Sequence, residues 1–302
     1  MLSVILPTYN RFEIVEETLQ KIVTLETNIP FEIIVVNDGQ ELPFNMQHEK
    51  LSIYKNPKKG ASAARNFGAS KAKYDIFFFI DDDMWISVES IEAIAQLYQQ
   101  HFFDKQCVNL NWQYPKSLCD KMRNEKIGRY LLHANYHTLE GRSKIKVDSA
   151  SSLVPVTSMG SGSFAIGKSV FESIGKYNEN ILFQGEDIEL SKKLNEANIP
   201  IFLYTPITCF HNQKDRLDIN EFLDRDRRGY VSQFENKKNE TKHSRLKQII
   251  YTCFIPFNFL FKKLFDILPN RAAFDIITFK TIGILSSIVY FKAWYQSSKN
   301  HK

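Results

Sequence analysis

The 302-residue chain has few of the residues that build disulfide-stapled or zinc-stapled proteins. Its four cysteines are scattered, with no CxxC pair and no histidine at zinc-finger spacing. This excludes a disulfide framework and a zinc module, so we expect a reduced, cytosolic protein. The opening residues, MLSVILPTYN, lack a basic stretch followed by a long apolar run, so we expect no signal peptide.

Long apolar runs, internal repeats and low-complexity tracts are also absent. The C-terminal part has two apolar clusters, 249–261 and 276–291. Pro256 interrupts the first cluster, and Lys280 and Gly283 dilute the second. A membrane-spanning helix needs roughly 20 apolar residues in succession, so we expect no spanning helix.

Charge is distributed unevenly along the chain. Residues 237–302 carry twelve Lys/Arg and three acidic residues, a net +9, which leaves −4 for the preceding part. Phenylalanines lie beside Lys262 and Lys263, as in helices that lie among lipid headgroups. We therefore expect peripheral contact of residues 246–296 with the anionic inner face of the plasma membrane. The alternative is a helical extension packed on the rest of the chain or on a second subunit.

Strand and helix patterns alternate over the first hundred residues, which predicts an α/β fold with a Rossmann-like, mostly parallel central sheet flanked by helices. Residues 102–215 are less regular. The predicted strands are Ser3–Pro7, Phe31–Asp38, Leu51–Asn56 and Tyr74–Ile80, and the predicted helices are Arg11–Leu25, Gly60–Ala72 and Val88–His101.

Three of these four strands end in polar residues: Thr8–Arg11, Asn37–Gly39 and Asp81–Asp83. In parallel sheets ligands collect beyond the carboxyl ends of the strands. The three adjacent aspartates would repel one another unless a positive charge lies among them. A divalent cation that also binds substrate phosphates fits this arrangement. The alternative is a solvated acidic turn.

Two later segments have the composition of a site. Gly160–Phe164 is a glycine- and serine-rich loop whose backbone is expected to approach something closely. Glu186 and Asp187 precede a predicted helix over residues 188–197, whose N-terminus favours ionised carboxylates. The alternative role for Asp187 is capping that helix.

Six blocks in order carry a family resemblance: SVILPTYNR, EIIVVNDG, KGASAARNFG, FIDDDM, GSGSFAI and GEDIEL. Over about Leu2 to Asn212 the chain resembles an inverting family two glycosyltransferase of the GT-A fold, of the type that builds bacterial surface polysaccharides. The resemblance implies a glycosyltransferase domain at 1–215, with a nucleotide-binding half at 1–105 and an acceptor half at 106–215. Residues 216–302 would then form a C-terminal helical extension.

The resemblance also implies donor-side roles. Asp38 would contact the base, although NDG is also a common turn. Arg65 would approach the nucleotide, although it could instead pair with a surface carboxylate. Asp81 would face the ribose and Asp83 would ligate Mn²⁺ or Mg²⁺. The remaining donor-binding candidates are Thr8, Tyr9, Arg11 and Asp82.

On the acceptor side, the resemblance assigns Asp187 as the base and Glu186 as a residue that positions hydroxyl groups. The metal would replace the leaving-group acid that a glycosidase needs. His211 would complete the metal site, which suits Mn²⁺ better than Mg²⁺; the alternative is a structural histidine.

The predicted function is transfer of a hexosyl or N-acetylhexosaminyl group from a nucleotide-sugar, UDP-linked, to a hydroxyl of a glycan or lipid-linked acceptor. The alternatives are a non-catalytic nucleotide- or sugar-binding relative and a nucleotidyltransferase. The latter needs a glycine-rich loop after the first strand, which PTYNR resembles poorly. No nucleic-acid partner is expected. Trp112, Tyr114 and Tyr130 could stack on sugars or fill a core.

Overall fold

The computed structural model describes residues 1–143, 152–181, 184–236 and 257–300. It divides into two compact units, each described here by itself. The sheet unit consists of Met1–Pro115, Thr138–Leu182 and Glu186–Asn212, and the helical unit of Lys116–His137, Phe183–Gly185 and Gln213–Lys302. Residues 116–137, expected in the acceptor half, thus group with the C-terminal helices. The functional halves themselves stay a prediction.

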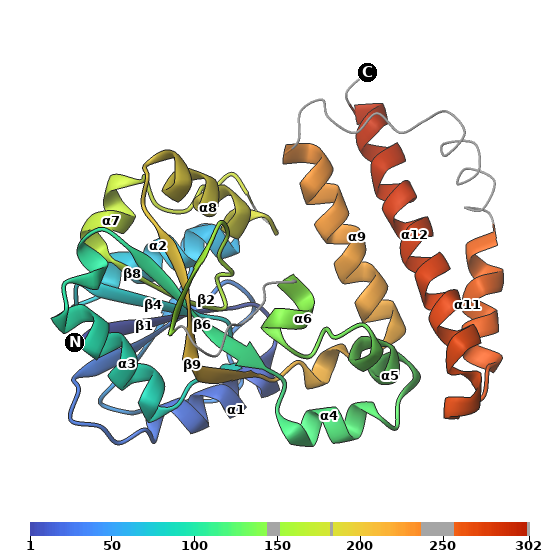
Figure 1. Ribbon diagram of the computed structural model, residues 1–302, viewed down its shortest axis with the longest axis horizontal. Coiled ribbons are helices and arrows are strands. Elements are labelled where there is room, and N and C mark those ends of the chain that lie inside the picture. The colour runs from blue at the N-terminus through green and yellow to red at the C-terminus, as the bar shows by residue number, and fades with distance from the viewer. Residues whose placement is uncertain (144–151, 182–183, 237–256, 301–302) are drawn as a thin grey trace. The chain divides into compact units, whose positions relative to one another are not determined.

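The sheet unit is built on a nine-stranded mixed sheet, counted over the described residues, with the order β3-β2-β1-β4-β8-β6-β9-β5 and β7 paired with β9 (Figure 1). β3, β2, β1 and β4 are parallel, and β8 runs antiparallel to both β4 and β6. The strands are β1 Leu2–Thr8, β2 Phe31–Asn37, β3 Leu51–Lys55, β4 Ile76–Ile80, β5 Met84–Trp85, β6 Cys107–Gln113, β7 Leu153–Val156, β8 Ser163–Gly167 and β9 Ile201–His211.

Helices cover both faces of this sheet. Figure 1 shows α1 and α3 on one side and α2, α7 and α8 on the other. The predicted strands and helices of the first hundred residues are confirmed, with ends that shift by a few residues. The helices of the sheet unit are α1 Phe12–Val23, α2 Ala61–Lys71, α3 Val88–Gln99, α6 Leu139–Ser143, α7 Lys168–Ser173 and α8 Glu186–Glu196, with a 3₁₀ turn at Phe102–Asp104.

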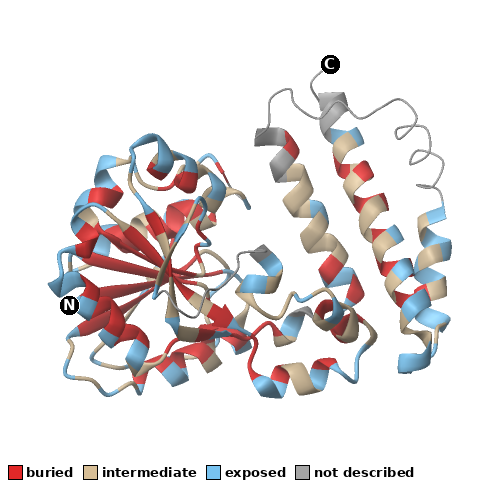
Figure 2. Cartoon of the chain, viewed as in Figure 1, coloured by how far each residue is buried: buried red, intermediate tan, exposed pale blue. Residues whose placement is uncertain are grey.

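The core follows from the apolar runs. Every residue of β1, β2 and β4 is buried, as expected for strands covered on both faces (Figure 2). Phe77 and Phe79 of β4 pack against Phe171 of α7, with ring centroids 5.7 and 5.3 Å apart. The small residues of α2 allow close packing: a Cβ at Gly68 would lie 2.5 Å from Ile5. The sheet edge is thereby a rigid base for the groups that follow its strands.

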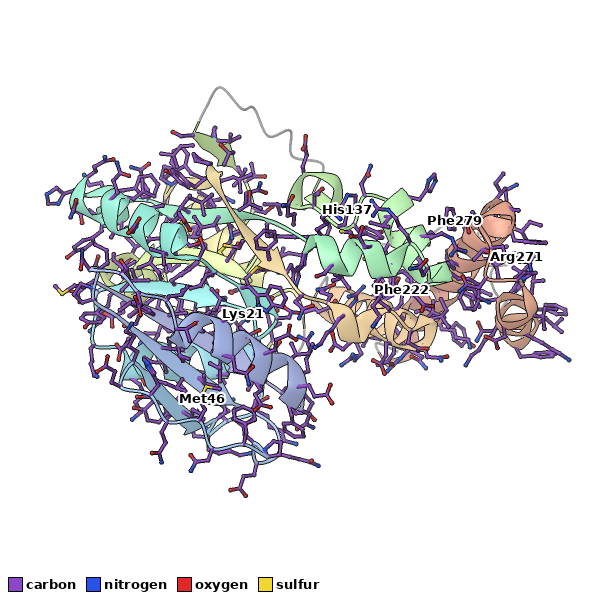
Figure 3. All side chains as sticks on the ribbon, turned by 90° about the horizontal axis from the view of Figure 1, so that it is seen from below. Lys21, Met46, His137, Phe222, Arg271 and Phe279 are labelled. Atoms are coloured by element: carbon purple, nitrogen blue, oxygen red, sulfur yellow. The ribbon has the colours of Figure 1, made fainter. Side chains whose placement is uncertain are left out.

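The helical unit consists of helices packed through aromatic side chains and a few buried polar pairs. Tyr130 is half-buried and packs edge-on against Phe222 and Phe279, with centroids 6.0 and 5.7 Å away. Figure 3 labels these two phenylalanines. Arg129 Nε lies 2.9 Å from a carboxylate oxygen of Asp275. The elements are α4 Lys116–Met122, α5 Lys126–His133, α9 Ile219–Asn236, α11 Asn258–Ile267 and α12 Asp275–Asn300, with 3₁₀ turns at Lys214–Arg216 and Ala272–Phe274.

The C-terminal helix is longer and more apolar than the sequence pattern predicts. Ala272–Gln296 is long and apolar enough to cross a membrane by length and composition, and 28% of its apolar window is buried. Lys280 does not shorten it, because a single lysine on a long helix can extend its amine away from apolar surroundings. Length and composition do not distinguish a spanning helix from one packed in a bundle. The apolar cluster at 249–261 lies largely outside the described residues.

Candidate active site

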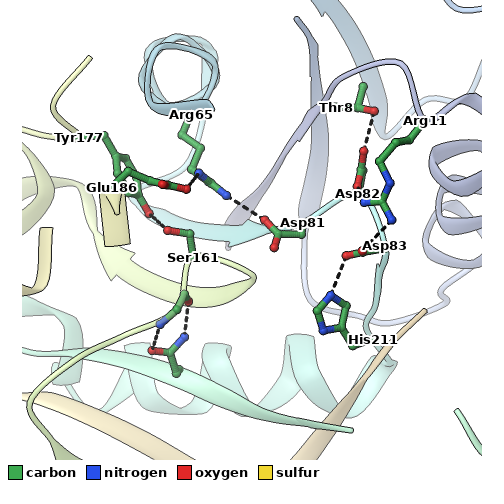
Figure 4. A network of polar contacts seen from close by, with 12 residues as sticks. Thr8, Arg11, Arg65, Asp81, Asp82, Asp83, Ser161, Tyr177, Glu186 and His211 are labelled. Atoms are coloured by element: carbon green, nitrogen blue, oxygen red, sulfur yellow. Dashed lines mark hydrogen bonds and ion pairs between the residues drawn. The ribbon is translucent and has the colours of Figure 1, made fainter. Parts of the chain in front are cut away.

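The carboxyl ends of β1, β2 and β4 meet, as the polar strand ends predicted. The backbone N–H of Asp38 donates to the carbonyl of Thr8 over 2.8 Å. The Thr8 hydroxyl donates to Asp82 over 2.8 Å (Figure 4). Residues more than seventy positions apart in the chain thus share one polar edge because parallel strands end on the same side.

Asp82 and Asp83 are buried and paired, whereas Asp81 is half-buried. Arg11, at the start of α1, donates to Asp82 with one guanidinium nitrogen and to Asp83 with the other, the latter at 2.8 Å. Asp83 is 1% exposed. Burial raises the pKa of Asp82 to about 6, against the lowering effect of the Arg11 charge. The alternative of a solvated acidic turn is therefore wrong.

His211 lies at the end of β9 and joins this cluster. Its Nε2 is 3.0 Å from Asp83 Oδ1. Trp112 packs edge-on against the imidazole with centroids 4.9 Å apart, and Tyr114 does so at 5.9 Å. Both aromatic side chains are buried, so they hold the histidine in place and are not open platforms for a sugar.

Three of these residues form a possible metal site. Ligand atoms of Asp81, Asp83 and His211 all lie within 4.8 Å of one another. Two carboxylates and one imidazole suit a divalent cation such as Mn²⁺. Asp82 instead faces Thr8 and Arg11. The residues present therefore fit a cation, and Asp81 joins Asp83 and His211 in the possible ligand set. Its predicted contact with the ribose stays a prediction.

Arg65 of α2 connects the aspartates to the start of α8. It is 3% exposed, and its two terminal nitrogens lie 2.8 Å from Asp81 and 3.0 Å from Glu186. The guanidinium also lies over the Tyr177 ring, 5.5 Å from its centroid. Burial alone would lower the pKa of Arg65, but the charges of Asp81 and Glu186 outweigh burial and raise it. Arg65 is thus a buried charged connection and does not form the surface ion pair considered as an alternative.

α8 begins at Glu186, two residues earlier than predicted. Asp187 accepts a hydrogen bond of 2.8 Å from the N–H of Ile188, its neighbour in the chain. Burial raises the pKa of Asp187 to about 6, and the nearby Glu186 charge acts in the same direction. The helix N-terminus was expected to favour the ionised form, yet burial and the like charge outweigh it.

The sequence did not single out Tyr177, Ser161 or Asn109 individually. The Tyr177 hydroxyl donates to Ser161 over 3.2 Å, and the Asn109 amide donates to the Gly160 carbonyl over 2.6 Å. A Cβ at Gly162 would lie 2.9 Å from an Asp81 carboxylate oxygen. The glycine- and serine-rich loop was thus correctly expected to make a close approach, and its neighbour is Asp81.

Two other predicted donor residues lie at the same edge. Asp38 accepts hydrogen bonds from the Asn56 amide at 2.7 Å and from the Gly60 N–H at 3.0 Å, so it ties down the loop before α2. Tyr9 is 57% exposed. The predicted donor-binding roles of Asp38 and Tyr9 stay predictions.

Comparison with known proteins gives the family. Residues 3–148 match the model of glycosyl transferase family 2. This segment is just under half of the chain, and the match supports the prediction of a family two glycosyltransferase. Hyaluronan synthase from Pasteurella multocida is 44% identical over 91 residues, which are 28% of this chain and 9% of that protein. The present chain thus aligns with about a tenth of the length of the Pasteurella multocida protein.

Two solved structures share the fold of this chain. S. aureus TarS 1-349 superposes with a TM-score of 0.51 at 12% identity, covering 100% of this chain and 92% of that one. GalNAc-T7 with UDP, GalNAc and Mn²⁺ gives 0.51 at 15% identity, covering 70% and 43%. The prediction of a GT-A fold is confirmed. The family match supports glycosyl transfer and favours neither nucleotidyl transfer nor a non-catalytic relative.

Proposed function

We propose that this protein is an inverting, metal-dependent glycosyltransferase. It moves a hexosyl or N-acetylhexosaminyl group from a UDP-sugar to a hydroxyl acceptor. One observation carries the proposal. The buried side chain of Arg65 joins Asp81, one of the three possible metal ligands, to Glu186, the chain neighbour of the candidate base Asp187. A leaving-group site and a candidate base thus lie on one continuous network of contacts.

On the donor side, a nucleotide would bind at the strand ends, among Thr8, Tyr9, Arg11 and Asp38. Asp81 and Asp82 would face its ribose, and Arg65 would lie behind Asp81. The GalNAc-T7 structure holds UDP and Mn²⁺, which supports a UDP-sugar and Mn²⁺ here. Asp83 and His211, with Asp81, would hold the cation. When bound, such a cation stabilises the charge of the departing diphosphate.

On the acceptor side, Asp187 takes the proton of the acceptor hydroxyl as its oxygen bonds to the anomeric carbon and the bond from that carbon to the diphosphate breaks. A single displacement inverts the configuration. With a pKa of about 6, Asp187 is ionised at neutral pH and still basic enough to accept the proton. Glu186, held by Arg65, positions hydroxyl groups beside it.

The acceptor in this proposal is a growing surface glycan or a lipid-linked sugar at the cytoplasmic face of the plasma membrane. Similarity to a hyaluronan synthase supports a glycan acceptor. The basic C-terminal region supports a location near anionic lipid.

A thermal-shift panel of nucleotide-sugars with and without Mn²⁺ tests the donor side. The cognate donor should stabilise the protein by about 2.7 kcal/mol at a hundred times its Kd, and only when Mn²⁺ is present. The Asp83→Asn variant should lose this Mn²⁺ dependence. Equal stabilisation of both proteins by every donor would refute the metal-dependent proposal.

A further inference from the structure

The helical unit exposes a concentrated apolar surface at α11 and the start of α12. Among the described residues, six of the fourteen exposed large apolar side chains fall between residues 257 and 277. We call these six the α11 face. They are Phe257, Phe259, Leu260, Ile267, Ile276 and Ile277, between 45% and 72% exposed.

α11 gains little from packing in its own unit. Its sequence, NFLFKKLFDI, has six large apolar residues in ten, and of the whole helix, all of which is described, Phe265 is the one buried residue. Figure 2 shows α11 mostly pale blue and tan. Phe257, Leu260, Phe261 and Leu264 line an open groove of about 370 Å³. Such a surface in water is typical of a binding or membrane contact.

Positive charge surrounds this apolar surface. Lys262 and Lys263 are exposed on α11. Arg271 is exposed in the turn before α12 (Figure 3). Asp275 is paired with Arg129, which leaves Asp266 as the exposed acidic residue of 257–277. Apolar side chains flanked by lysine and arginine match the boundary between acyl chains and anionic headgroups.

We infer that the α11 face inserts into the headgroup region of an anionic bilayer. This rests on the proposed location at a membrane and not on the proposed chemistry. A second copy of the chain fits less well, because a two-fold interface would place the same basic residues against themselves.

α12 does not cross the bilayer in this arrangement. Ser286 donates to Asp226 of α9 over 2.9 Å, and Tyr290 packs edge-on against Tyr230 and Phe234, with centroids 4.9 and 5.3 Å away. α9 carries the run DRDRRG at 224–229. A spanning α12 would break these contacts or carry those charges into hydrocarbon, which is costly. The apolar length of α12 therefore serves its helical unit, and the α11 face makes the membrane contact.

Flotation of the full chain with lipid vesicles tests the inference. Binding is expected to vesicles that contain phosphatidylglycerol and to be much weaker with phosphatidylcholine alone. The double variant Phe259→Ser/Ile276→Ser should bind about a hundredfold more weakly. Lys262→Gln/Lys263→Gln should lose about 25-fold, from roughly fivefold per lysine, and only with the anionic vesicles.

Matched controls change exposed side chains elsewhere. Tyr98→Ser on α3 and Lys105→Gln should bind as the unchanged protein does, and all variants should unfold at similar temperatures. Unchanged flotation of the Phe259/Ile276 variant would overturn the inference. So would a dimer that this variant dissociates while vesicles bind neither protein.

Two outcomes separate this inference from a membrane-spanning α12 and from the proposed chemistry. Protein that stays with membranes after both high-salt and alkaline washes would indicate a spanning α12 and overturn the peripheral contact. Normal sugar transfer to a soluble acceptor without any vesicle binding would refute the membrane surface and leave the proposed chemistry standing.

Discussion

Two regions of this protein are rich in aspartate and arginine, yet the fold gives them opposite properties. At the sheet edge, Asp82 and Asp83 are buried with Arg11, and burial raises the pKa of Asp82 to about 6. On α9, Asp224 and Arg227 are each 47% exposed, and the hydrogen bond from Arg227 lowers the pKa of Asp224. The two regions contain the same residue types. Desolvation raises the pKa of a carboxyl group at the sheet edge, and shifted pKa values of this kind are typical of functional sites.

The largest expected effect comes from the candidate base. Asp187→Asn should lower kcat by roughly 10²- to 10⁴-fold, because the amide cannot accept the hydroxyl proton. Nucleotide binding should persist, measured by thermal shift with UDP and Mn²⁺. Unchanged turnover would remove Asp187 from this role and leave the metal cluster as the poised part of the site.

The buried aspartate should matter more than its exposed counterpart. Asp83→Ala should lower kcat by about 10³-fold, since charge stabilisation at the leaving group supplies several kcal/mol. Added Mn²⁺ should no longer raise activity or thermal stability. A variant that keeps its Mn²⁺ response would show that the cluster is not the metal site.

Breaking the buried connection should destabilise the fold as well. Arg65→Met leaves Asp81 and Glu186 without their shared partner, at an expected cost of about 3–5 kcal/mol of unfolding free energy. Urea denaturation measures it. A loss under 1 kcal/mol would indicate that the two carboxylates find other partners. Arg65→Lys should recover part of the stability while kcat stays low, because lysine cannot pair with both carboxylates in the same geometry.

The raised pKa of Asp187 predicts an acid limb in the pH profile. The base acts when ionised, so kcat/KM should be constant above about pH 6 and fall about tenfold per unit below it. Asp82 is also raised to about 6, so the profile of Asp82→Asn serves as the control and should keep the limb. Disappearance of the limb in that variant would assign it to Asp82.

The smallest effect is expected on the exposed side of the comparison. Asp224→Asn breaks ion pairs with Arg227 and Arg228 at 2.8 and 3.0 Å, and each exposed pair contributes roughly 0.2–1 kcal/mol. Stability should change by under about 2 kcal/mol and kcat not at all. A marked loss of kcat would mean that DRDRRG takes part in the reaction.

The sequence alone predicts much of the sheet unit. Short continuous apolar runs are typical of strands buried on both faces, and a helix of small residues can pack closely on a sheet. Local composition therefore predicts these elements. Polar residues after three strands then locate the site, because parallel strands end at one edge. The membership of Thr8, Arg11 and the three aspartates in one cluster follows from that rule.

Tertiary structure decides what each charge does. Nothing in the order of residues says that Arg65 binds Asp81 and Glu186, 16 and 121 positions away, or that Trp112 and Tyr114 hold His211. Residue order also does not reveal that burial raises the pKa of Asp187, although a helix start would lower it. Nor does it reveal that several apolar side chains of α11 remain exposed. Side-chain partners and desolvation depend on distances between remote segments, and only the folded chain determines those distances.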